Sequence, residues 1–303
     1  MEQTIFADLH NHTTASDGDF TPDEIVRQAK TKGIKAIGIT DHDTLNGLND
    51  AVAAGKKYDI EVIPGVEVSI RFKRSYFTGT LHLLCYFSDS MLLNNIFVKE
   101  FNNILMHGRG EQLVRARINE INKFFSPLLK KNNLLKRNME FKDIAALSSN
   151  ATRRHFAMAL KESFNITDTD TIKTIIGNES KAYLPSGIQL EKITDFIHEN
   201  KILTVLAHPA AGSFPGKGHY KEVLPPVKIV EKIFPEFLKA GIHGLEVYYP
   251  GHTKKYKKLL KSWAVKHKLL ITGGSDCHDG DIRPLGVDGI CQSEFKIFKK
   301  ALL

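Results

Sequence analysis

The stretch Asp8-Leu9-His10-Asn11-His12 decides the fold and the chemistry that we expect of this chain. It closes an apolar run, Ile5 to Leu9, which is typical of a short buried strand. Residues two apart point to the same side of an extended chain, so His10 and His12 would present two imidazoles together where the strand ends. Neutral imidazole is the commonest metal ligand, and Asp17 can add a carboxylate oxygen. The pair of histidines alone does not establish a metal site.

An apolar run that ends in His, Asp or Glu recurs along the chain. Seven strand candidates follow this pattern, six with such residues at their ends and one with His82 inside: Ile5–Leu9, Ile34–Thr40, Ile60–Pro64, Thr80–Leu84, Leu203–Ala207, Gly244–Tyr248 and Leu269–Thr272. Segments with helical spacing, such as Pro22 to Lys32 and Thr253 to His267, lie between most of them. Alternating strands and helices predict parallel strands in an α/β barrel, whose strand ends converge on one mouth.

Each of these polar residues alone has an ordinary structural explanation. His82 could be a hydrogen-bonded core residue, and Glu67 could cap a turn. Burying so many ionisable groups in one region without a cation would be costly, however. We therefore predict one multinuclear metal site at the barrel mouth.

Together the motifs resemble those of the PHP (polymerase and histidinol phosphatase) superfamily of metal-dependent phosphoesterases. The resemblance covers the barrel strands from end to end and implies a distorted (β/α)7 TIM-like barrel. The stretches that carry it are Asp8-Leu9-His10-Asn11-His12 with Asp17, Ile39-Thr40-Asp41-His42, Pro64-Gly65-Val66-Glu67, His82, Ala207-His208-Pro209, and Gly274-Ser275-Asp276 with His278.

The resemblance also implies three divalent ions, which could be Mn²⁺, Fe²⁺, Zn²⁺ or Mg²⁺ because a mixed ligand set accepts each of them. His10, His12, Glu67 and Asp276 would hold the first ion, Glu67, His82 and His208 the second, and Asp17, His42 and His278 the third. Two close cations lower the pKa of a bridging water and stabilise both the attacking and the leaving oxygen of an in-line displacement. We expect a metal-bridging hydroxide, held by Glu67 with Asp276, to attack the phosphate.

The strand pattern stops between about Met91 and Ser186, where the sequence becomes helical and basic. We expect a barrel from residues 1–90 and 187–303, and a helical insertion domain from residues 91–186. Helices of this length, with Asn94 to Phe125 and Asp143 to Lys161 the longest, would fold over the barrel mouth as a cap. The resemblance agrees, since the branch of nucleoside-3′,5′-bisphosphate phosphatases that also act as 5′-3′ exoribonucleases has such an insertion between the same strands.

The arginine-histidine motif of that branch, often Arg-Pro-His, corresponds to Arg153-Arg154-His155. Arg153 would contact a substrate phosphate, although Arg154 in the place of proline changes the start of the helix. Arg109 is a second candidate, and His155, His219 and His252 are further candidates for phosphate contacts. A solvated helix face is the alternative for each arginine, and a plain connecting loop is the alternative for the segment with His219.

Composition adds weaker constraints. The 42 basic and 34 acidic residues leave a formal charge of +8, which favours polyanionic ligands. Arg71, Lys73 and Arg74, beside Tyr76 and Phe77, form either a surface for a nucleic-acid strand or an ordinary charged hairpin. Three cysteines indicate a reducing compartment, the first strand begins too near Met1 for a signal peptide, and no apolar run reaches membrane-spanning length. We expect a cytoplasmic enzyme with no membrane and no obligate protein partner.

We predict a metal-dependent phosphoesterase that hydrolyses a phosphate ester of a nucleotide-like substrate, either a nucleoside 3′,5′-bisphosphate or the 5′ end of a short RNA. Three alternatives stay open. They are a histidinol-phosphate phosphatase, a catalytically silent nucleotide or nucleic-acid binding module, and a hydrolase of C–N bonds.

Overall fold

Seven strands form a single curved sheet in the order β1 to β7 in the computed structural model, which describes residues 4–215 and 224–303. The strands are β1 (Ala7–Asp8), β2 (Ala36–Ile39), β3 (Glu61–Arg74), β4 (Phe77–Tyr86), β5 (Leu203–Leu206), β6 (Gly244–Tyr248) and β7 (Leu270–Gly273). The backbone N–H of Leu9, just after β1, donates to the carbonyl of Gly273 in β7 at 3.1 Å. This bond between the two edges leaves the sheet nearly closed into a barrel.

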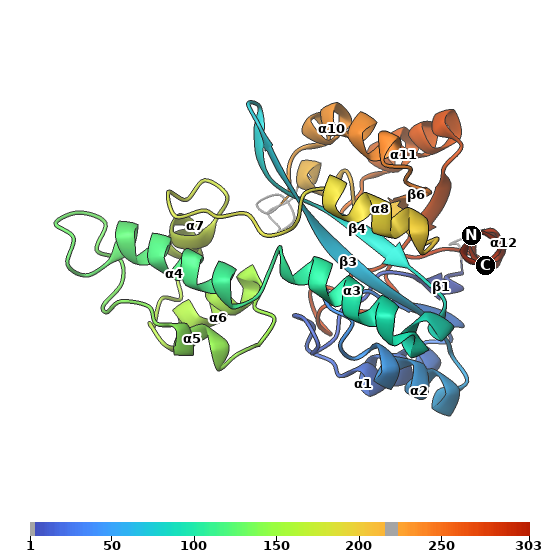
Figure 1. Ribbon diagram of the computed structural model, residues 1–303, viewed down its shortest axis with the longest axis horizontal. Coiled ribbons are helices and arrows are strands. Elements are labelled where there is room, and N and C mark those ends of the chain that lie inside the picture. The colour runs from blue at the N-terminus through green and yellow to red at the C-terminus, as the bar shows by residue number, and fades with distance from the viewer. Residues whose placement is uncertain (1–3, 216–223) are drawn as a thin grey trace.

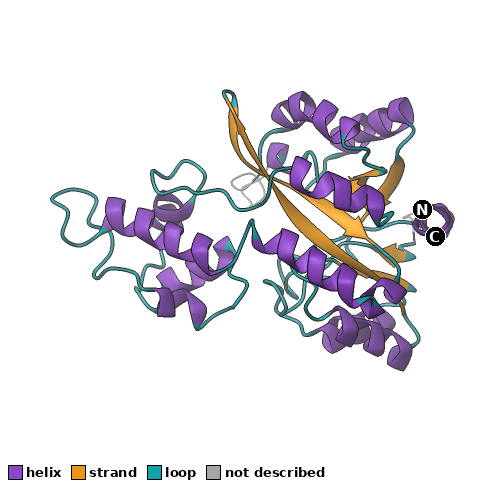
Figure 2. Ribbon diagram, in the orientation of Figure 1, coloured by secondary structure: helices purple, strands orange, loops and turns teal. Residues whose placement is uncertain are grey.

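The sheet is mixed, so the expectation of all-parallel strands is wrong at β4. This strand is antiparallel to both of its neighbours, β3 and β5, whereas the other pairs are parallel. Only the two residues Ser75 and Tyr76 separate β3 from β4, and a connection this short can join only antiparallel strands. The resulting hairpin extends past the surrounding helices (Figure 2).

The pleat of β3 separates two kinds of side chain. Val66, Val68, Ile70 and Phe72 are buried in the apolar core between the sheet and its covering helices. The alternate residues, Glu67, Ser69, Arg71 and Lys73, face the other side, where Glu67 and Ser69 are buried while Arg71 and Lys73 are exposed. One face of the hairpin therefore runs from the barrel mouth out to solvent.

Helices cover the outside of the sheet (Figure 1). The helices of the barrel are α1 (Pro22–Thr31), α2 (Leu48–Tyr58), α3 (Asn95–Met106), α8 (Glu191–Glu199), α10 (Val227–Lys239), α11 (Lys254–His267) and α12 (Gln292–Leu302), and short 3-10 helices lie at Asp89–Leu93 and Ala211–Ser213. α1 shows why these segments are helical, because Thr21 and Glu24 form a capping box and Pro22 opens the first turn. Its buried side, with Ile25, packs into the main core.

Helices α4 (Glu111–Phe125), α5 (Phe141–Ala145), α6 (Arg153–Glu162) and α7 (Thr169–Ile176) form a separate group, which we call the helical unit. It lies to one side of the barrel in Figure 1 and has an apolar core of its own, with members such as Val114, Phe156 and Ile172. By contrast, α3 buries Phe97 and Phe101 in the barrel core. The separate helical core therefore begins after α3, later in the chain than the expected boundary at Met91.

Glycines mark the two crossings between the barrel and the helical unit. The chain leaves near Gly108 and returns at Gly187, whose N–H donates to the Gly108 carbonyl at 2.9 Å. A Cβ on Gly108 would lie 2.5 Å from the Gly187 carbonyl carbon, so the two crossings touch where only glycine fits. The same region breaks the expected helix Asn94 to Phe125 into α3 and α4, and Gly110 there has a left-handed φ of +82°.

Among the helices in the described part of the chain, none combines the length and the apolar composition that a bilayer crossing requires.

Replacement of Phe156, which is 2% exposed in the core of the helical unit, tests whether that core holds the unit together. Phe156→Ala is expected to lower the free energy of unfolding by about 3–5 kcal/mol, because it removes a buried ring and leaves a cavity. Urea unfolding followed by circular dichroism measures the change. Leu128→Ala is the control, since Leu128 is 87% exposed. A loss below about 1 kcal/mol for Phe156→Ala would contradict a packed core.

Candidate metal centre

The strand ends bring all nine predicted metal ligands to the barrel mouth. His10, His12 and Asp17 follow β1, and His42 follows β2. The remaining ligands come from the rest of the sheet: Glu67 from β3, His82 from β4, His208 after β5, and Asp276 and His278 after β7. The ring or carboxylate atoms of all of them except His208 form groups whose members lie within 4.8 Å of one another: His12, Asp17, His42 and His278; His10, His12, Glu67 and Asp276; and His42, Glu67 and His82.

Glu67, which is 1% exposed, lies at the centre of these groups. Its Oε1 is 3.0 Å from His82 Nδ1 and 2.9 Å from His208 Nε2. Its Oε2 is 3.3 Å from His10 Nε2, 3.1 Å from His12 Nε2 and 3.1 Å from His42 Nδ1. One carboxylate thus faces five imidazoles, which fits the bridging position that the resemblance implies for it.

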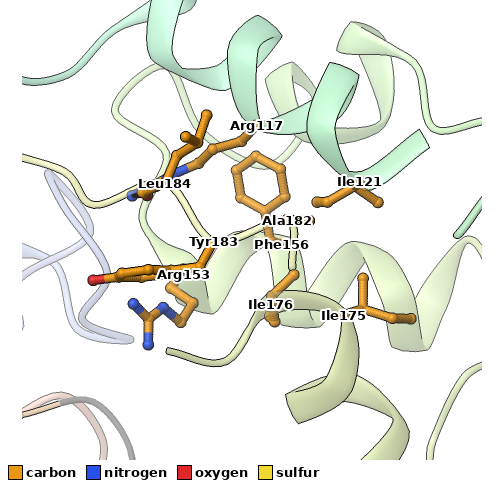
Figure 3. A pocket seen from close by; sticks show the side chains of 9 residues that line it. All are labelled: Arg117, Ile121, Arg153, Phe156, Ile175, Ile176, Ala182, Tyr183 and Leu184. Carbon is orange, nitrogen blue, oxygen red and sulfur yellow. Dashed lines mark hydrogen bonds between the residues drawn. The ribbon is translucent and has the colours of Figure 1, made fainter. Parts of the chain in front are cut away.

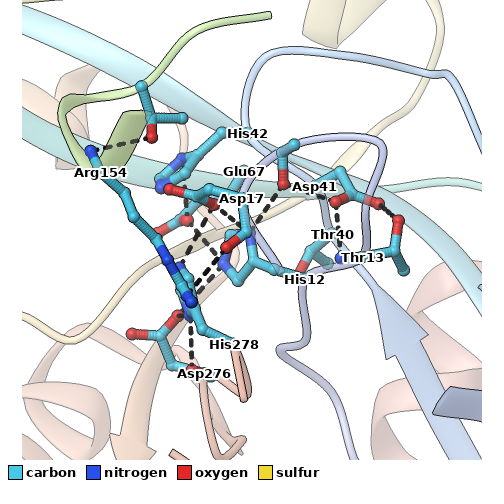
Figure 4. A network of polar contacts seen from close by, with 12 residues as sticks. His12, Thr13, Asp17, Thr40, Asp41, His42, Glu67, Arg154, Asp276 and His278 are labelled. Atoms are coloured by element: carbon cyan, nitrogen blue, oxygen red, sulfur yellow. Dashed lines mark hydrogen bonds and ion pairs between the residues drawn. The ribbon is translucent and has the colours of Figure 1, made fainter. Parts of the chain in front are cut away.

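Asp17 and His278 form a second focus together with His12 and His42 (Figure 4). Asp17 Oδ1 lies 3.3 Å from His278 Nε2 and 3.7 Å from His12 Nδ1. This grouping agrees with the implied third set and adds His12 to it, so His12 stands between the two foci.

Carboxylates outside the nine proposed ligands hold the imidazoles and loops in place. Glu246 Oε1 lies 3.0 Å from His10 Nδ1, and its Oε2 accepts the backbone N–H of His208 at 2.7 Å. Asp8 accepts the Ser275 N–H at 2.9 Å, and Asp41 accepts the Thr13 N–H at 2.7 Å. Such outer carboxylates fix the orientation of metal-binding histidines. Sequence reasoning missed Glu246 as a site residue, although it lies in a strand that shows the same pattern.

The ligand loops approach each other closely. A Cβ on Gly274 would lie 2.5 Å from the backbone N of His10, so glycine is required for the end of β7 to reach the end of β1. Asp276 and His208 adopt positive φ angles of +50° and +29°. Strained backbone of this kind is concentrated at functional sites and is held there by surrounding contacts.

Mutual electrostatics keep the central acids ionised. Burial raises the pKa of Glu67, but His42, His82 and His10 together hold it well below its usual range. Burial likewise raises the pKa of Asp276, whereas Arg283 and His278 bring it well below normal. Burial lowers the pKa of His12, but Asp276 and Glu67 raise it to about 9. Since a metal needs neutral imidazole, its binding here would release protons.

Two buried polar atoms at the site support a cation. Asp17 Oδ1 and His42 Nδ1 make no hydrogen bond to any other described residue. Each has a close ionisable neighbour, His278 Nε2 at 3.3 Å and Glu67 Oε2 at 3.1 Å, but leaving buried polar atoms without a hydrogen bond is costly, and a divalent ion would satisfy both. Imidazole nitrogens mixed with carboxylate oxygens are also the donor set that manganese, iron and zinc accept. The residues present therefore fit bound divalent metal.

The candidates for phosphate contacts are placed differently from one another. Arg109 is 6% exposed, and its guanidinium donates to Asp43, to Ser69 Oγ at 3.3 Å and to the Ala151 carbonyl at 3.3 Å. His155 Nδ1 accepts the Thr152 N–H at 3.0 Å and so caps α6. The side chains of Arg109 and His155 therefore already form hydrogen bonds within the protein.

His252 is also occupied within the fold. Its Nε2 accepts the Ala210 N–H at 3.1 Å, which leaves Nδ1 as the donor to the Val247 carbonyl at 3.0 Å. Burial lowers the pKa of His252 to about 3, so the ring is neutral. His219 lies outside the described residues.

Arg153 lines a small cavity of about 20 Å³ in the helical unit (Figure 3). Its guanidinium lies 5.2 Å from the centre of the Tyr183 ring, and Arg117 lies on the same cavity. Arg117 donates through Nε and Nη2 to the Leu184 carbonyl, and burial, together with Arg153 and Arg109, lowers its pKa to about 9. Within the described residues neither Arg117 nor Arg153 has a carboxylate ion-pair partner. Sequence reasoning missed Arg117, which it could have found only as an arginine on the apolar side of α4.

Residues 8–174, more than half of the chain, match a family model described as the PHP domain. The chain belongs to the PHP domain family. The resemblance in the motifs is thereby confirmed, and this PHP chain is a metal-dependent phosphoesterase, a hydrolase that acts on phosphate esters.

Three curated relatives match the PHP chain over most of its length. A 5′-3′ exoribonuclease of Haemophilus influenzae is 26% identical, with 89% of each chain covered. A phosphoribosyl 1,2-cyclic phosphate 1,2-diphosphodiesterase of Eggerthella lenta is 25% identical and covers 90% of this chain and 94% of its own. A 3′,5′-nucleoside bisphosphate phosphatase of Chromobacterium violaceum is 25% identical, and the match covers 89% of this chain and 86% of the relative. The relatives share a class of chemistry and differ in the substrate that they are named for.

A solved structure shows the same fold. The crystal structure of a proposed metal-dependent phosphoesterase from Bifidobacterium adolescentis superimposes with a TM-score of 0.73 at 22% identity, and the match covers 100% of this chain and 98% of that one. Because the match spans both chains, it includes the helical unit as well as the barrel.

Replacement of Glu67 tests its central position. Glu67→Gln keeps the shape of the side chain but removes the charge that faces five imidazoles, so metal affinity is expected to fall by more than the roughly 10–100-fold typical of outer contacts. The metal retained after dialysis is measured by elemental analysis. Glu231→Gln, on the exposed side of α10, is the matched control and should retain the wild-type amount. Equal retention by both variants would exclude Glu67 as a shared ligand.

Proposed function

We propose that this chain hydrolyses a phosphate ester of a nucleotide-like substrate, either a nucleoside 3′,5′-bisphosphate or the 5′ end of a short RNA. The observation that carries the proposal is the buried Glu67 carboxylate facing five imidazoles at the barrel mouth. Two of the relatives, named as an exoribonuclease and as a bisphosphate phosphatase, support the substrate class.

The nine ligands would hold three divalent ions of manganese, iron, zinc or magnesium in a distorted (β/α)7 barrel. When bound, such ions activate water and neutralise the charge that develops on the transferred phosphate. Glu67 and Asp276 would orient the attacking water, since an oxygen of each lies 3.1 Å from His12 Nε2. Tyr249 and Arg283 hold the other oxygen of Asp276, Oδ2, at 3.1 and 2.8 Å.

A protein nucleophile is not needed for this reaction. Cys277 lies between two of the proposed ligands, but its thiol is buried and points to the Asp279 carbonyl at 3.7 Å. Burial raises the pKa of Cys277 to about 12, so the thiol is protonated and unreactive at neutral pH.

Substrate phosphate would bind between the barrel mouth and the helical unit, with the unit acting as the cap of the site. Arg153 is the preferred phosphate ligand, because it has no carboxylate ion-pair partner among the described residues. Arg117, whose Nε and Nη2 already donate to the Leu184 carbonyl, would add only its positive charge beside it. Arg109, His155 and His252 would then act indirectly, since other groups of the protein already occupy them.

Purified protein supplied with manganese is tested against adenosine 3′,5′-bisphosphate, a short 5′-phosphorylated RNA and histidinol phosphate in parallel. Release of phosphate or nucleotide is expected from at least one of the first two substrates. Asp276→Ala should reduce this release to background, because it removes a carboxylate from beside His12.

Asp195→Ala is the matched control for that variant, since Asp195 lies exposed on α8 and should retain wild-type turnover. Turnover of histidinol phosphate alone would contradict the nucleotide-like substrate. Binding of nucleotide without turnover, with metal bound, would favour the catalytically silent module.

One feature of the hairpin favours an RNA end as substrate. Arg71 and Lys73 lie on the same face of β3 as Glu67, and alternate residues place Lys73 about 20 Å further along the strand. Both side chains are exposed, and neither makes an ion pair within the described residues. Nucleotides downstream of a scissile 5′ end could follow this face, whereas a small bisphosphate could not reach its outer end.

Arg71→Ala with Lys73→Ala is expected to raise KM for the RNA by roughly 10-fold at low salt, because two phosphate contacts are lost. Turnover of adenosine 3′,5′-bisphosphate should not change. Steady-state kinetics with both substrates measure the difference. Lys254→Ala with Lys258→Ala removes the same charge from α11 and is the control. Equal effects on both substrates, or none on the RNA, would leave the hairpin as an ordinary charged surface.

A further inference from the structure

The segment that opens α6 contacts two loops of the metal centre (Figure 4). Arg154 Nη1 donates to the backbone carbonyl of Asp17 at 3.0 Å, and its Nη2 donates to Asp19 Oδ1 at 2.7 Å. Asn150 Nδ2 donates to the backbone carbonyl of His42 at 2.7 Å. The helical unit therefore forms hydrogen bonds with the backbone carbonyls of two proposed ligands, Asp17 and His42. These bonds do not involve the side-chain atoms that would coordinate metal.

Asp17 and His42, whose carbonyls accept these hydrogen bonds, belong to one group of proposed ligands, formed by His12, Asp17, His42 and His278. The Asp19 N–H also donates to the His278 carbonyl at 2.7 Å, so Arg154 reaches a third member of the group through Asp19. We call this group the Asp17 subsite. The two buried atoms without hydrogen-bond partners, Asp17 Oδ1 and His42 Nδ1, are both part of it.

Ligands of the other group around Glu67 are held from within the barrel. Glu246 of β6 contacts His10 at 3.0 Å, and Arg283 donates to Asp276 at 2.8 Å. These contacts do not involve the helical unit. His12 and His42 also face Glu67, so a displacement of α6 would change the Asp17 subsite most and would reach the group around Glu67 only through these two shared imidazoles.

The Arg154 contact matters for the geometry of the loop more than for the free energy of its ion pair with Asp19. Arg154 and Asp19 have side chains that are 32% and 54% exposed, and exposed pairs of this kind contribute little to global stability. The two nitrogens of the guanidinium instead fix two points of one loop at once, which a single point charge cannot do. The effect of the contact is on geometry.

We propose that Asn150 and Arg154 are positioning residues that set the metal affinity of the Asp17 subsite by docking the helical unit onto its loops. This inference rests on the proposed function, because it takes the clustered residues as metal ligands. The coupling is reciprocal, so metal at the Asp17 subsite stabilises the docked position of α6. Arg153 lies between the two positioning residues, so phosphate bound there and metal at the subsite act on the same segment.

The test titrates metal-free protein with Mn²⁺ by calorimetry, for the wild type and for Asn150→Ala, Arg154→Ala and the double variant. The Mn²⁺ affinity of one class of site, which we assign to the Asp17 subsite, should fall about 10–100-fold in the variants, as when outer contacts of a metal are lost. The Mn²⁺ affinity of the tighter class of site should change by no more than about twofold. Arg154→Lys keeps the charge but cannot contact both points, so it should restore only part of the affinity.

Arg115→Ala is the matched control, because Arg115 lies on α4 of the same unit, where it pairs with Glu111 at 2.6 Å and lies 4.2 Å from the centre of the Phe141 ring, both within the helical unit. A second readout is hydrogen exchange of α6, which Mn²⁺ should slow in the wild type and in Arg115→Ala but not in Arg154→Ala.

Unchanged Mn²⁺ affinities in all variants would overturn the inference, as would equal weakening of every class of site. Phosphate release by the wild type is measured alongside. If the wild type releases phosphate and the variants keep the wild-type Mn²⁺ affinities, the inference is overturned and the proposed function stands. If the wild type binds no metal, both the inference and the proposed function are overturned.

Discussion

A single buried carboxylate, that of Glu67, sets the condition on which the mouth of this barrel depends. Removing a carboxylate from water is costly unless opposite charge or hydrogen bonds replace the lost hydration. Five imidazoles from four other segments of the chain meet it at 2.9 to 3.3 Å. The arrangement exists only when the strands are paired in register, so the site is present only in the folded barrel.

The reversed direction of β4 explains the one exception in the sequence pattern. Parallel strands place polar residues where an apolar run ends, because the carboxyl ends lie at the mouth. β4 runs the opposite way, so its amino end approaches the mouth, and His82 is supplied from within the strand, opposite Ser69 of β3. The same hairpin carries the cationic residues outward on the face that holds Glu67.

The helical unit is joined to the barrel by polar contacts at its base, although its apolar core is separate. Arg109 donates to Asp43 and to the Ala151 carbonyl, and Asp43 accepts the Ser69 N–H at 2.6 Å. The sequence predicted that Arg109 contacts substrate phosphate. In the fold it is buried and connects the loop after β2 and Ser69 of β3 to the segment before α6. These hydrogen bonds link the helical unit to the loops beside the candidate metal centre.

The sequence by itself determined the alternation of strands and helices and the His, Asp and Glu side chains at most strand ends, because burial period and donor chemistry are local properties of the chain. Its motifs also identified the family. Tertiary structure alone decided the antiparallel hairpin, the late start of the helical core, and the partners of Arg109, His252 and Arg154, since these depend on contacts between segments far apart in the chain. Glu246 shows the difference, because its place within a strand is local, while its contacts with His10 and His208 required the folded barrel.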